Sequence, residues 1–257
     1  MITVSYIHAF SDNYIWLIHK ENEKNIVIVD PGDSKPVLAA IEQHKYKPVA
    51  ILVTHHHPDH IGGIQQLTRL YDIPVYGPGN ENISAITHPV KEGDHVLISD
   101  LEVDFKVMDV PGHTRGHIAY LTQNRLFCGD TLFTGGCGRL FEGTPAQMHH
   151  SLGKIAALPD ETLVYCAHEY TLDNLSFAEV VEPGNMDLLQ RIKDTQAARR
   201  LNQPTVPATL ALEKATNPFL RCHITNVIKA AEQYALKRLE SGADIFSVIR
   251  YWKDKLD

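Results

Sequence analysis

Short apolar runs separated by turn residues mark the first two thirds of the chain. Residues 26–29, 50–53 and 74–76 form runs of strand length, and the stretches 36–44 and 63–71 between them carry apolar residues at helical spacing. Strands that alternate with helices in this way predict an α/β fold.

After Tyr170 the pattern becomes mainly helical. The stretches 175–181, 187–202 and 226–240 repeat apolar positions at helical spacing, while strand-like segments fade. We therefore expect two domains, an α/β domain over residues 1–170 and a mainly helical domain over residues 171–257.

Composition places the chain among globular proteins. It has 257 residues, of which 44% are hydrophobic, and no apolar run approaches the twenty residues of a membrane span. Residues 1–20 lack the basic-then-apolar order of a secretion signal. We expect a cytoplasmic protein, a monomer, without a membrane partner.

The formal net charge of -7 argues against nucleic acid as a partner, because phosphate binding needs a concentrated basic surface. A small anionic substrate is compatible with this charge if a few cations gather at the site. The candidates are Arg139, which follows a Gly-rich loop, and Arg250 with Lys253 near the C-terminus.

A dense group of metal ligands follows the apolar run at 50–53. Strand side chains alternate, so His55 and His57 would face one way and His56 the other. A tetrahedral ion that keeps a water position needs three protein ligands. The segment offers two pairs, His55 with His57 and Asp59 with His60, which predicts two adjacent ions.

Three later apolar segments end in residues that could complete these sites. His113 follows a Pro-Gly turn, and Asp130 and His168 each end a short strand. A carboxylate can bridge two cations, which an imidazole usually cannot, so we expect Asp130 to bridge while His113 and His168 complete one ion each. The residues named so far already supply the ligands that two ions need, so His117 is not required as a ligand. We expect it and His56 to have structural roles or to orient ligands.

The motif His55-x-His57-x-Asp59-His60, with His113, Asp130 and His168, resembles the metallo-β-lactamase superfamily. Segments over essentially the whole chain resemble one branch of it, the glyoxalase II (hydroxyacylglutathione hydrolase) family. These segments are Asp12-Asn13-Tyr14, Val29-Asp30-Pro31-Gly32-Asp33, Gly129-Asp130-Thr131-Leu132-Phe133, Gly136-Cys137-Gly138-Arg139, Phe141-Glu142-Gly143-Thr144 and Ala167-His168-Glu169-Tyr170-Thr171.

The resemblance implies an αβ/βα sandwich of two mixed sheets followed by a small helical domain. It also implies a thioester hydrolase that cleaves S-D-lactoylglutathione to glutathione and D-lactate, the second step of methylglyoxal detoxification, with hydroxide generated on two divalent ions. Zinc is the expected metal. Iron and manganese are alternatives, because histidine and carboxylate ligands accept all three.

The same resemblance assigns Arg139, Tyr170, Arg250 and Lys253 to glutathione binding. Without it, Arg250 and Lys253 would be interpreted as a solvated helix face with i,i+3 spacing. Phe141 stands where some family members have a tyrosine, so a hydroxyl contact with glutathione is expected to be missing there.

Two acidic residues have further expected roles. Asp59, besides being a ligand, would orient the attacking water, and Asp130 shares with it the catalytic assignment. Asp30, which ends an early strand, is a candidate support for the ligands.

The four cysteines, Cys128, Cys137, Cys166 and Cys222, show no paired short spacing and are expected to be free thiols. Cys128 and Cys166 lie in apolar runs near proposed ligands, where we expect small buried hydrophobic residues and not ligands.

Two alternative functions stay open. A glutathione-linked persulfide dioxygenase would use one iron held by two histidines and a carboxylate. A non-catalytic domain stabilised by metal would favour cysteine-rich, closed coordination.

Overall fold

The structure is a computed structural model, and it describes residues 2–256. The chain divides into two compact units. The N-terminal unit comprises the residues up to Asp109 together with Arg115–Gly129, and the C-terminal unit comprises Val110–Thr114 together with the residues from Asp130 on. The expected domain boundary at residue 170 stays a prediction.

The described strands form two six-stranded sheets and a two-stranded ribbon. The first sheet lies in the N-terminal unit, and its strands follow chain order. Its first three strands are antiparallel and the remaining ones parallel, which makes the sheet mixed. The strands are β1 (Ile2–Ala9), β2 (Asn13–Lys20), β3 (Asn25–Val29), β4 (Lys47–Leu52), β5 (Val75–Pro78) and β6 (His88–Val90).

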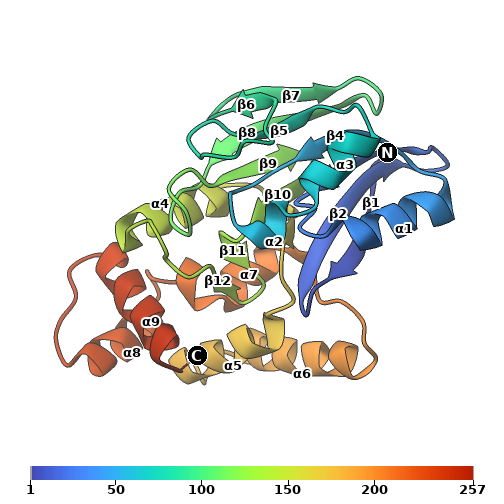
Figure 1. Ribbon diagram of the computed structural model, residues 1–257. Coiled ribbons are helices and arrows are strands. Elements are labelled where there is room, and N and C mark those ends of the chain that lie inside the picture. Colours follow the sequence, from blue (N-terminus) through green and yellow to red (C-terminus); the bar gives the residue numbers. More distant parts are fainter. Residues whose placement is uncertain (1, 257) are drawn as a thin grey trace. The chain divides into compact units, whose positions relative to one another are not determined.

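Helices connect the parallel strands from β3 to β5, whereas residues 79–87 join the parallel strands β5 and β6 without a helix. Helix α1 (Ser34–His44) joins β3 to β4, and α2 (Pro58–Ile61) and α3 (Ile64–Leu70) join β4 to β5. Helix α1 lies beside β1 and packs against α3 (Figure 1).

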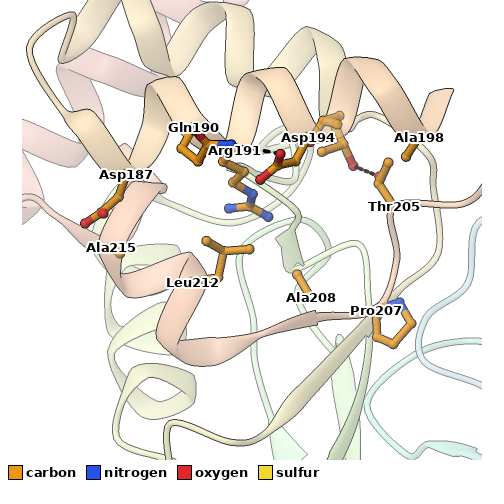
Figure 2. A pocket seen from close by; sticks show the side chains of 12 residues that line it. Asp187, Gln190, Arg191, Asp194, Ala198, Thr205, Pro207, Ala208, Leu212 and Ala215 are labelled. Atoms are coloured by element: carbon orange, nitrogen blue, oxygen red, sulfur yellow. Dashed lines mark hydrogen bonds between the residues drawn. The ribbon is translucent and has the colours of Figure 1, made fainter. Parts of the chain in front are cut away.

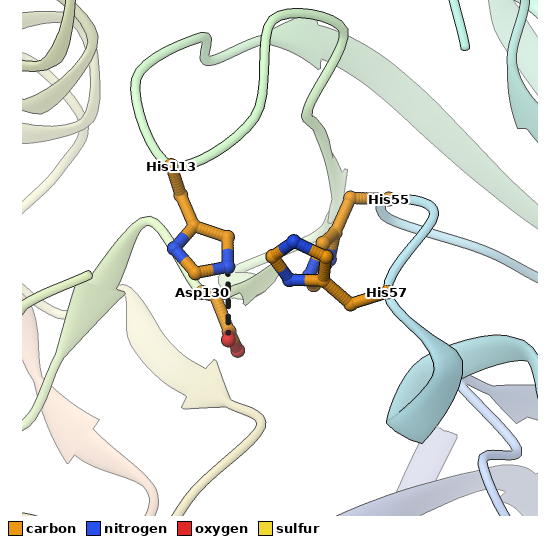
Figure 3. A group of neighbouring side chains, drawn as sticks. All are labelled: His55, His57, His113 and Asp130. Carbon is orange, nitrogen blue, oxygen red and sulfur yellow. Dashed lines mark hydrogen bonds and ion pairs between the residues drawn. The ribbon is translucent and has the colours of Figure 1, made fainter. Parts of the chain in front are cut away.

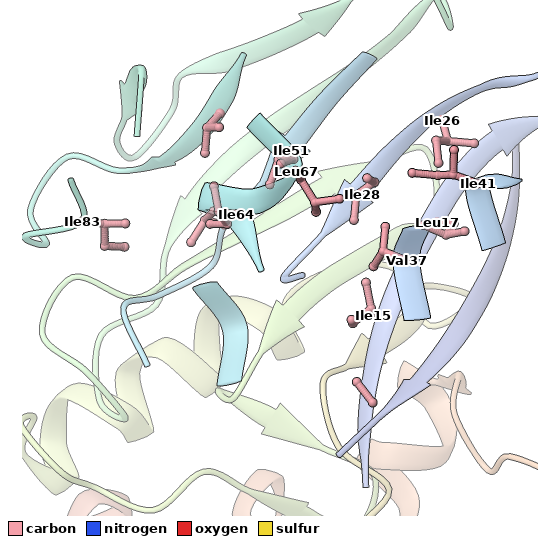
Figure 4. Close-up of a cluster of buried hydrophobic side chains, with 13 residues drawn as sticks. Ile15, Leu17, Ile26, Ile28, Val37, Ile41, Ile51, Ile64, Leu67 and Ile83 are labelled. Carbon is pink, nitrogen blue, oxygen red and sulfur yellow. The ribbon is translucent and has the colours of Figure 1, made fainter. Parts of the chain in front are cut away.

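Strand β2 shows why this sheet needs cover on both faces. Its residues from Asn13 to Ile18 are all buried. Ile15 and Leu17 enter a cluster with Val37 of α1 and Ile64 of α3 (Figure 4). Tyr14 and Trp16 point to the opposite face by strand alternation and are also buried. A strand that is apolar on both faces is typical of a sheet between two layers.

The other strands of the N-terminal unit form an antiparallel meander in the order β10-β9-β8-β7. They are β7 (His95–Ile98), β8 (Val103–Asp109), β9 (Ile118–Thr122) and β10 (Arg125–Gly129). The meander contacts the segment after β4, because Tyr120 Oη donates to Val53 O at 3.0 Å and Ile118 N to Thr54 O at 3.0 Å. Burial raises the pKa of Tyr120, which keeps its hydroxyl protonated as this donor.

The C-terminal unit is mainly helical. Its strands pair antiparallel, β11 (Leu132–Phe133) with β12 (Gly136–Cys137) and β13 (Leu163–Cys166) with β14 (Ala208–Thr209). Its helical elements are α4 (Pro145–Ala156), α5 (Thr171–Val181), α6 (Met186–Arg200), α7 (Leu210–Thr216), the 3₁₀ turn η1 (Pro218–Leu220), α8 (Thr225–Ala235) and α9 (Gly242–Leu256). Helix α9 packs against α4 and α8, and α5 packs against α6.

Most elements predicted from the sequence pattern are present. The predicted helix over 226–240 was too long, because Leu236 adopts a left-handed backbone with φ of 54° and ends α8 at Ala235. None of the helices within residues 2–256 is long and apolar enough to cross a membrane.

A buried ion pair links the helices of the C-terminal unit to its β11–β12 ribbon. Arg191 of α6 donates to Glu213 of α7 and, at 2.6 Å, to Thr216 Oγ1. Glu213 also accepts from Gly135 N at 2.9 Å and Asn217 Nδ2 at 3.0 Å. Because Gly135 lies between β11 and β12, this pair fixes the loop of the ribbon.

A cavity of about 580 Å³ lies beside Arg191. It is lined by α6, α7 and residues 205–208, and the Arg191 side chain points into it (Figure 2). None of the candidate metal ligands lines this cavity, so it is separate from the predicted metal site.

Replacing Arg191 with Met should lower the free energy of unfolding by about 3–5 kcal/mol, because the fully buried Glu213 carboxylate loses its cation. The matched control is K214M, which removes the more exposed pair of Lys214 with Asp160 and should cost about 0–1 kcal/mol. Urea unfolding of both variants measures the difference. Equal losses of unfolding free energy in the two variants would show that the buried ion pair stabilises the protein no more than the exposed pair does.

Candidate metal centre

The His-rich segment follows β4 directly, as the sequence predicts. Strand β4 ends at Leu52, residues 53–57 are extended chain without strand pairing, and Pro58 starts the one-turn helix α2. Proline suits a first helical position, since no hydrogen bond is lost there. His55 and His57 therefore precede the turn, while Asp59 and His60 lie on it.

The N-terminal unit holds two pairs of potential ligands. His55 Nε2 lies 3.1 Å from His57 Nδ1, and His60 Nε2 lies 3.4 Å from Asp59 Oδ2. The ring of His117 stacks on that of His55, with centroids 4.5 Å apart. His56 is in edge contact with His57, at 4.9 Å between centroids.

In the C-terminal unit the two oxygens of Asp130 face different imidazoles. Oδ2 lies 3.3 Å from His113 Nε2, and Oδ1 lies 3.4 Å from His168 Nε2. All three side chains are buried. Asp130 directly follows β10, and His168 comes two residues after β13, so strand ends present both residues.

Two groups of side chains could each hold a metal ion, with ligand atoms within 4.8 Å of one another. Figure 3 shows the group that contains His113 and Asp130. Ligands at about 2.0–2.2 Å from one tetrahedral ion are roughly 3.3–3.6 Å apart. The His–Asp distances above, 3.3 Å and 3.4 Å, match that spacing. The first group is His55, His57, His113 and Asp130, and the second is Asp59, His60 and His168.

The donor atoms suit a catalytic metal. Both groups contain imidazole nitrogens and carboxylate oxygens and no thiolate, a donor set that zinc, iron and manganese accept. Cysteine-rich ligation, which is typical of closed structural zinc sites, does not occur in either group.

Hydrogen bonds fix which nitrogen of two histidines can bind metal. His113 Nδ1 lies 2.8 Å from the carbonyl oxygen of Arg139, which can only accept, so Nδ1 carries the proton and Nε2 keeps its lone pair. His60 Nδ1 lies 3.0 Å from Asp30 Oδ2, with the same consequence. Asp30 thus contacts the candidate ligand His60, and its supporting role stays a prediction.

Thr54 is a supporting residue that sequence reasoning missed. Its backbone N–H donates to Asp30 Oδ1 at 2.8 Å and its hydroxyl to Asp30 Oδ2 at 2.7 Å. The hydroxyl oxygen can then accept from His55 Nδ1, 3.0 Å away. Thr54 and Asp30 thus connect His55 with His60. The only sequence signal was a polar residue between the apolar run and the first histidine.

Two glycines allow the backbone to approach the aspartate ligands. A Cβ at Gly138 would lie 1.9 Å from Asp130 O, and one at Gly32 would lie 1.8 Å from Asp59 O. No side chain fits at either position. The glycine in the Cys-Gly-Arg segment is therefore required by the packing around Asp130.

The four residues expected to bind substrate lie in the C-terminal unit. Tyr170 stacks on the ring of His168, with centroids 4.7 Å apart and planes 7° apart. Arg139 has a 48% exposed side chain, and its Nε lies 3.3 Å from Asp254 Oδ1. Phe141 is exposed and its ring meets that of His113 edge-on at 5.3 Å.

Arg250 and Lys253 of α9 are only 3% and 6% exposed, so a solvated helix face is the wrong interpretation. Arg250 donates to Cys137 O at 2.9 Å and to Asp254 Oδ1 at 3.0 Å, and it lies over the ring of Phe219. Lys253 lies over the ring of Phe177, 5.8 Å from its centroid. Both cations are held in place by packing.

Comparison with known families covers nearly the whole chain. Residues 10–168 match the model of the metallo-β-lactamase superfamily, and residues 169–256 match that of the hydroxyacylglutathione hydrolase C-terminus. The chain belongs to the hydroxyacylglutathione hydrolase family. It is 52% identical to the hydroxyacylglutathione hydrolase of Nitrosomonas europaea over 254 residues, which are 99% of this chain and 96% of that protein. Identity to the protein of the same name from Pseudomonas fluorescens is 48% over 256 residues, 99% of this chain and 100% of that one.

Solved structures share the fold, which has two mixed sheets with helices and a C-terminal helical region. The crystal structure of ETHE1 from Myxococcus xanthus has a TM-score of 0.68 and 25% identity, and covers 98% of this chain and 91% of its own. TTHA1623, solved in a di-iron-bound form, has a TM-score of 0.59 and 26% identity over 85% of this chain and 100% of its own.

The four cysteines are free, as predicted, and all four are buried, which was expected only for Cys128 and Cys166. Burial raises the pKa of Cys137 to about 11, against a smaller opposing effect of Arg250. It raises the pKa of Cys166 and of Cys222 to about 12. These thiols therefore stay protonated at neutral pH and are unreactive as nucleophiles.

The folded protein should not react with a thiol reagent at pH 8, whereas the unfolded chain should react at all four cysteines, as counted by mass spectrometry of alkylated protein. Burial of Cys137, Cys166 and Cys222 also makes stability depend on pH. Because the pKa values of these thiols are higher in the folded protein than in the unfolded chain, their contribution to the free energy of unfolding is complete below about pH 8.5. It is lost as the pH rises toward 11–12. Rapid labelling of Cys166 in folded protein at pH 8 would contradict the burial.

Proposed function

We propose that this chain hydrolyses the thioester of S-2-hydroxyacylglutathione, with S-D-lactoylglutathione as substrate and glutathione and D-lactate as products. The observation that carries the proposal is the pair of ligand groups together with Asp130, whose two oxygens face His113 of the first group and His168 of the second. The family relationship supports the same reaction.

We propose two divalent ions, zinc in both groups, with iron or manganese as alternatives. His55, His57 and His113 would hold one ion, and Asp59, His60 and His168 the other, with Asp130 shared through its two oxygens. The ions, when bound, lower the pKa of a water molecule and polarise the thioester carbonyl.

Two further steps of the reaction are the orientation of the attacking water and the departure of the thiolate. Asp59 has a side chain that is 39% exposed, so it can also accept a hydrogen bond from the attacking water and orient it. The leaving group is a thiolate, which is stable because a thiol has a pKa near 8.5, and it therefore needs no strong general acid.

Glutathione carries carboxylates, and the C-terminal unit supplies cations for them. Arg139, Arg250 and Lys253 are the proposed contacts, with Tyr170 beside His168. Arg139 and Arg250 both contact Asp254 Oδ1, so these two cations are close together. Such a local concentration of positive charge can attract an anion to a chain with a net charge of -7.

The ligand count disfavours the persulfide dioxygenase alternative. A single iron of that kind uses two histidines and one carboxylate, whereas residues 2–256 offer seven candidate ligands in two groups, four in one and three in the other. The His/Asp composition likewise disfavours a closed structural site. Cytoplasmic location and a monomeric state remain predictions.

Replacing Asp130 with Asn should abolish most thioester hydrolysis and lower metal occupancy in both groups, because the amide has one weak acceptor in place of two anionic oxygens. Steady-state hydrolysis of S-D-lactoylglutathione and elemental analysis of the same preparation measure both effects. Normal activity with full metal content would rule out a bridging Asp130.

Replacing Arg250 or Lys253 with Ala should chiefly raise KM for glutathione thioesters, since these cations bind the substrate away from the reacting carbonyl. Lys255, an exposed residue of the same helix, provides the control K255A, which should leave KM unchanged. A melting curve of each variant checks folding, because Arg250 also contacts Cys137 O. A change confined to kcat would contradict the binding role.

A further inference from the structure

The first residue of β2 contacts the second ligand group through its side chain. Asn13 Nδ2 donates to Asp59 Oδ2 at 2.9 Å, and the same oxygen lies 3.4 Å from His60 Nε2. We propose that Asn13 is a positioning residue that holds Asp59 in the orientation in which it binds its metal ion. This inference rests on the two-ion centre of the proposed function.

Asp59 needs such support more than the ligands beside it. Its side chain is 39% exposed, whereas that of His60 is 1% exposed. The side chains of Asp130 and His168 are 9% and 5% exposed. A half-exposed carboxylate has rotational freedom that metal binding must remove, at a cost in conformational entropy. A hydrogen bond that already selects one orientation reduces this cost.

Asn13 is itself held firmly. It is 5% exposed, starts β2 and pairs with Ala9, which closes the hairpin. Phe10, the first residue of the turn, adopts a left-handed backbone with φ of 52°. Strand alternation places Asn13 on the face that carries Ile15 and Leu17, the face covered by the helices of the first sheet. The strand register therefore directs the amide toward Asp59.

The backbone of Asp59 is fixed separately. Its carbonyl oxygen lies so close to Gly32 that a Cβ there would be 1.8 Å away. The Gly32 contact fixes the main chain of α2, and the Asn13 amide fixes the carboxylate. Both contacts lie within the N-terminal unit, so neither depends on a residue of the C-terminal unit.

The chemistry of an amide suits this position. The NH₂ group donates to one lone pair of the carboxylate and leaves the other for a cation. A lysine or arginine there would place a positive charge beside the ion, and an aspartate would repel Asp59. Asparagine thus orients the ligand and keeps its negative charge available for metal.

The test measures the affinity for each of two zinc ions by competition with a chromophoric chelator. N13L matches the shape of Asn13 but lacks the donor, and N13A removes the side chain beyond Cβ. The control S11A alters the same turn at an exposed residue whose hydroxyl donates to Asp12. Loss of a hydrogen bond to a metal ligand typically costs about 10–100-fold in metal affinity.

We expect N13L and N13A to weaken one of the two ions by about 10–100-fold and to leave the other ion as in wild type. S11A should change neither ion. The melting temperature of each metal-free variant separates this effect from misfolding, and N13A decides the test if N13L does not fold. Two ions bound by N13L as tightly as by wild type would overturn the role of Asn13. Wild-type protein that binds a single ion would instead contradict the proposed function.

Discussion

The carboxylate of Asp130 is the interaction on which the centre depends. Its two oxygens face His113 and His168, which belong to different ligand groups, and the side chain is buried. A buried carboxylate among imidazoles is costly unless cations compensate its charge. Two neighbouring divalent cations that share this anion would meet the requirement, and they would also place positive charge where a thioester carbonyl develops negative charge.

The surrounding chain is arranged to hold two of the candidate ligands in one tautomer and one orientation. The Arg139 carbonyl fixes the proton of His113, and Asp30 fixes that of His60. Thr54 binds Asp30 through both its backbone and its hydroxyl, so the ligands after β4 share one support. Loss of a partner of this kind typically costs about 10–100-fold in metal affinity or activity.

The pairing of the ligands could be predicted from sequence because it follows from short-range rules. The spacing of the residues after β4 pairs His55 with His57, and the turn at Pro58 pairs Asp59 with His60. The later ligands were predictable because each of them follows an apolar run. Their assignment to particular ions remains a proposal.

What the sequence could not predict depends on contacts between distant residues. Asn13 lies 46 positions from Asp59, and the Arg139 carbonyl lies 26 positions from His113. The helical spacing of Arg250 and Lys253 looks like a solvated face, because nothing nearby in the sequence reveals that Phe219 and Phe177 cover them. The helix predicted over 226–240 was too long because Leu236, which has a left-handed backbone, ends α8 although the apolar residues continue at helical spacing.

The central claim is that two ions are needed for hydrolysis. The most direct test is to titrate metal-free protein with zinc while measuring S-D-lactoylglutathione hydrolysis and bound zinc in the same samples. The account predicts that activity rises to its maximum only as the second ion binds, at two ions per chain. Full activity with a single ion bound would contradict it.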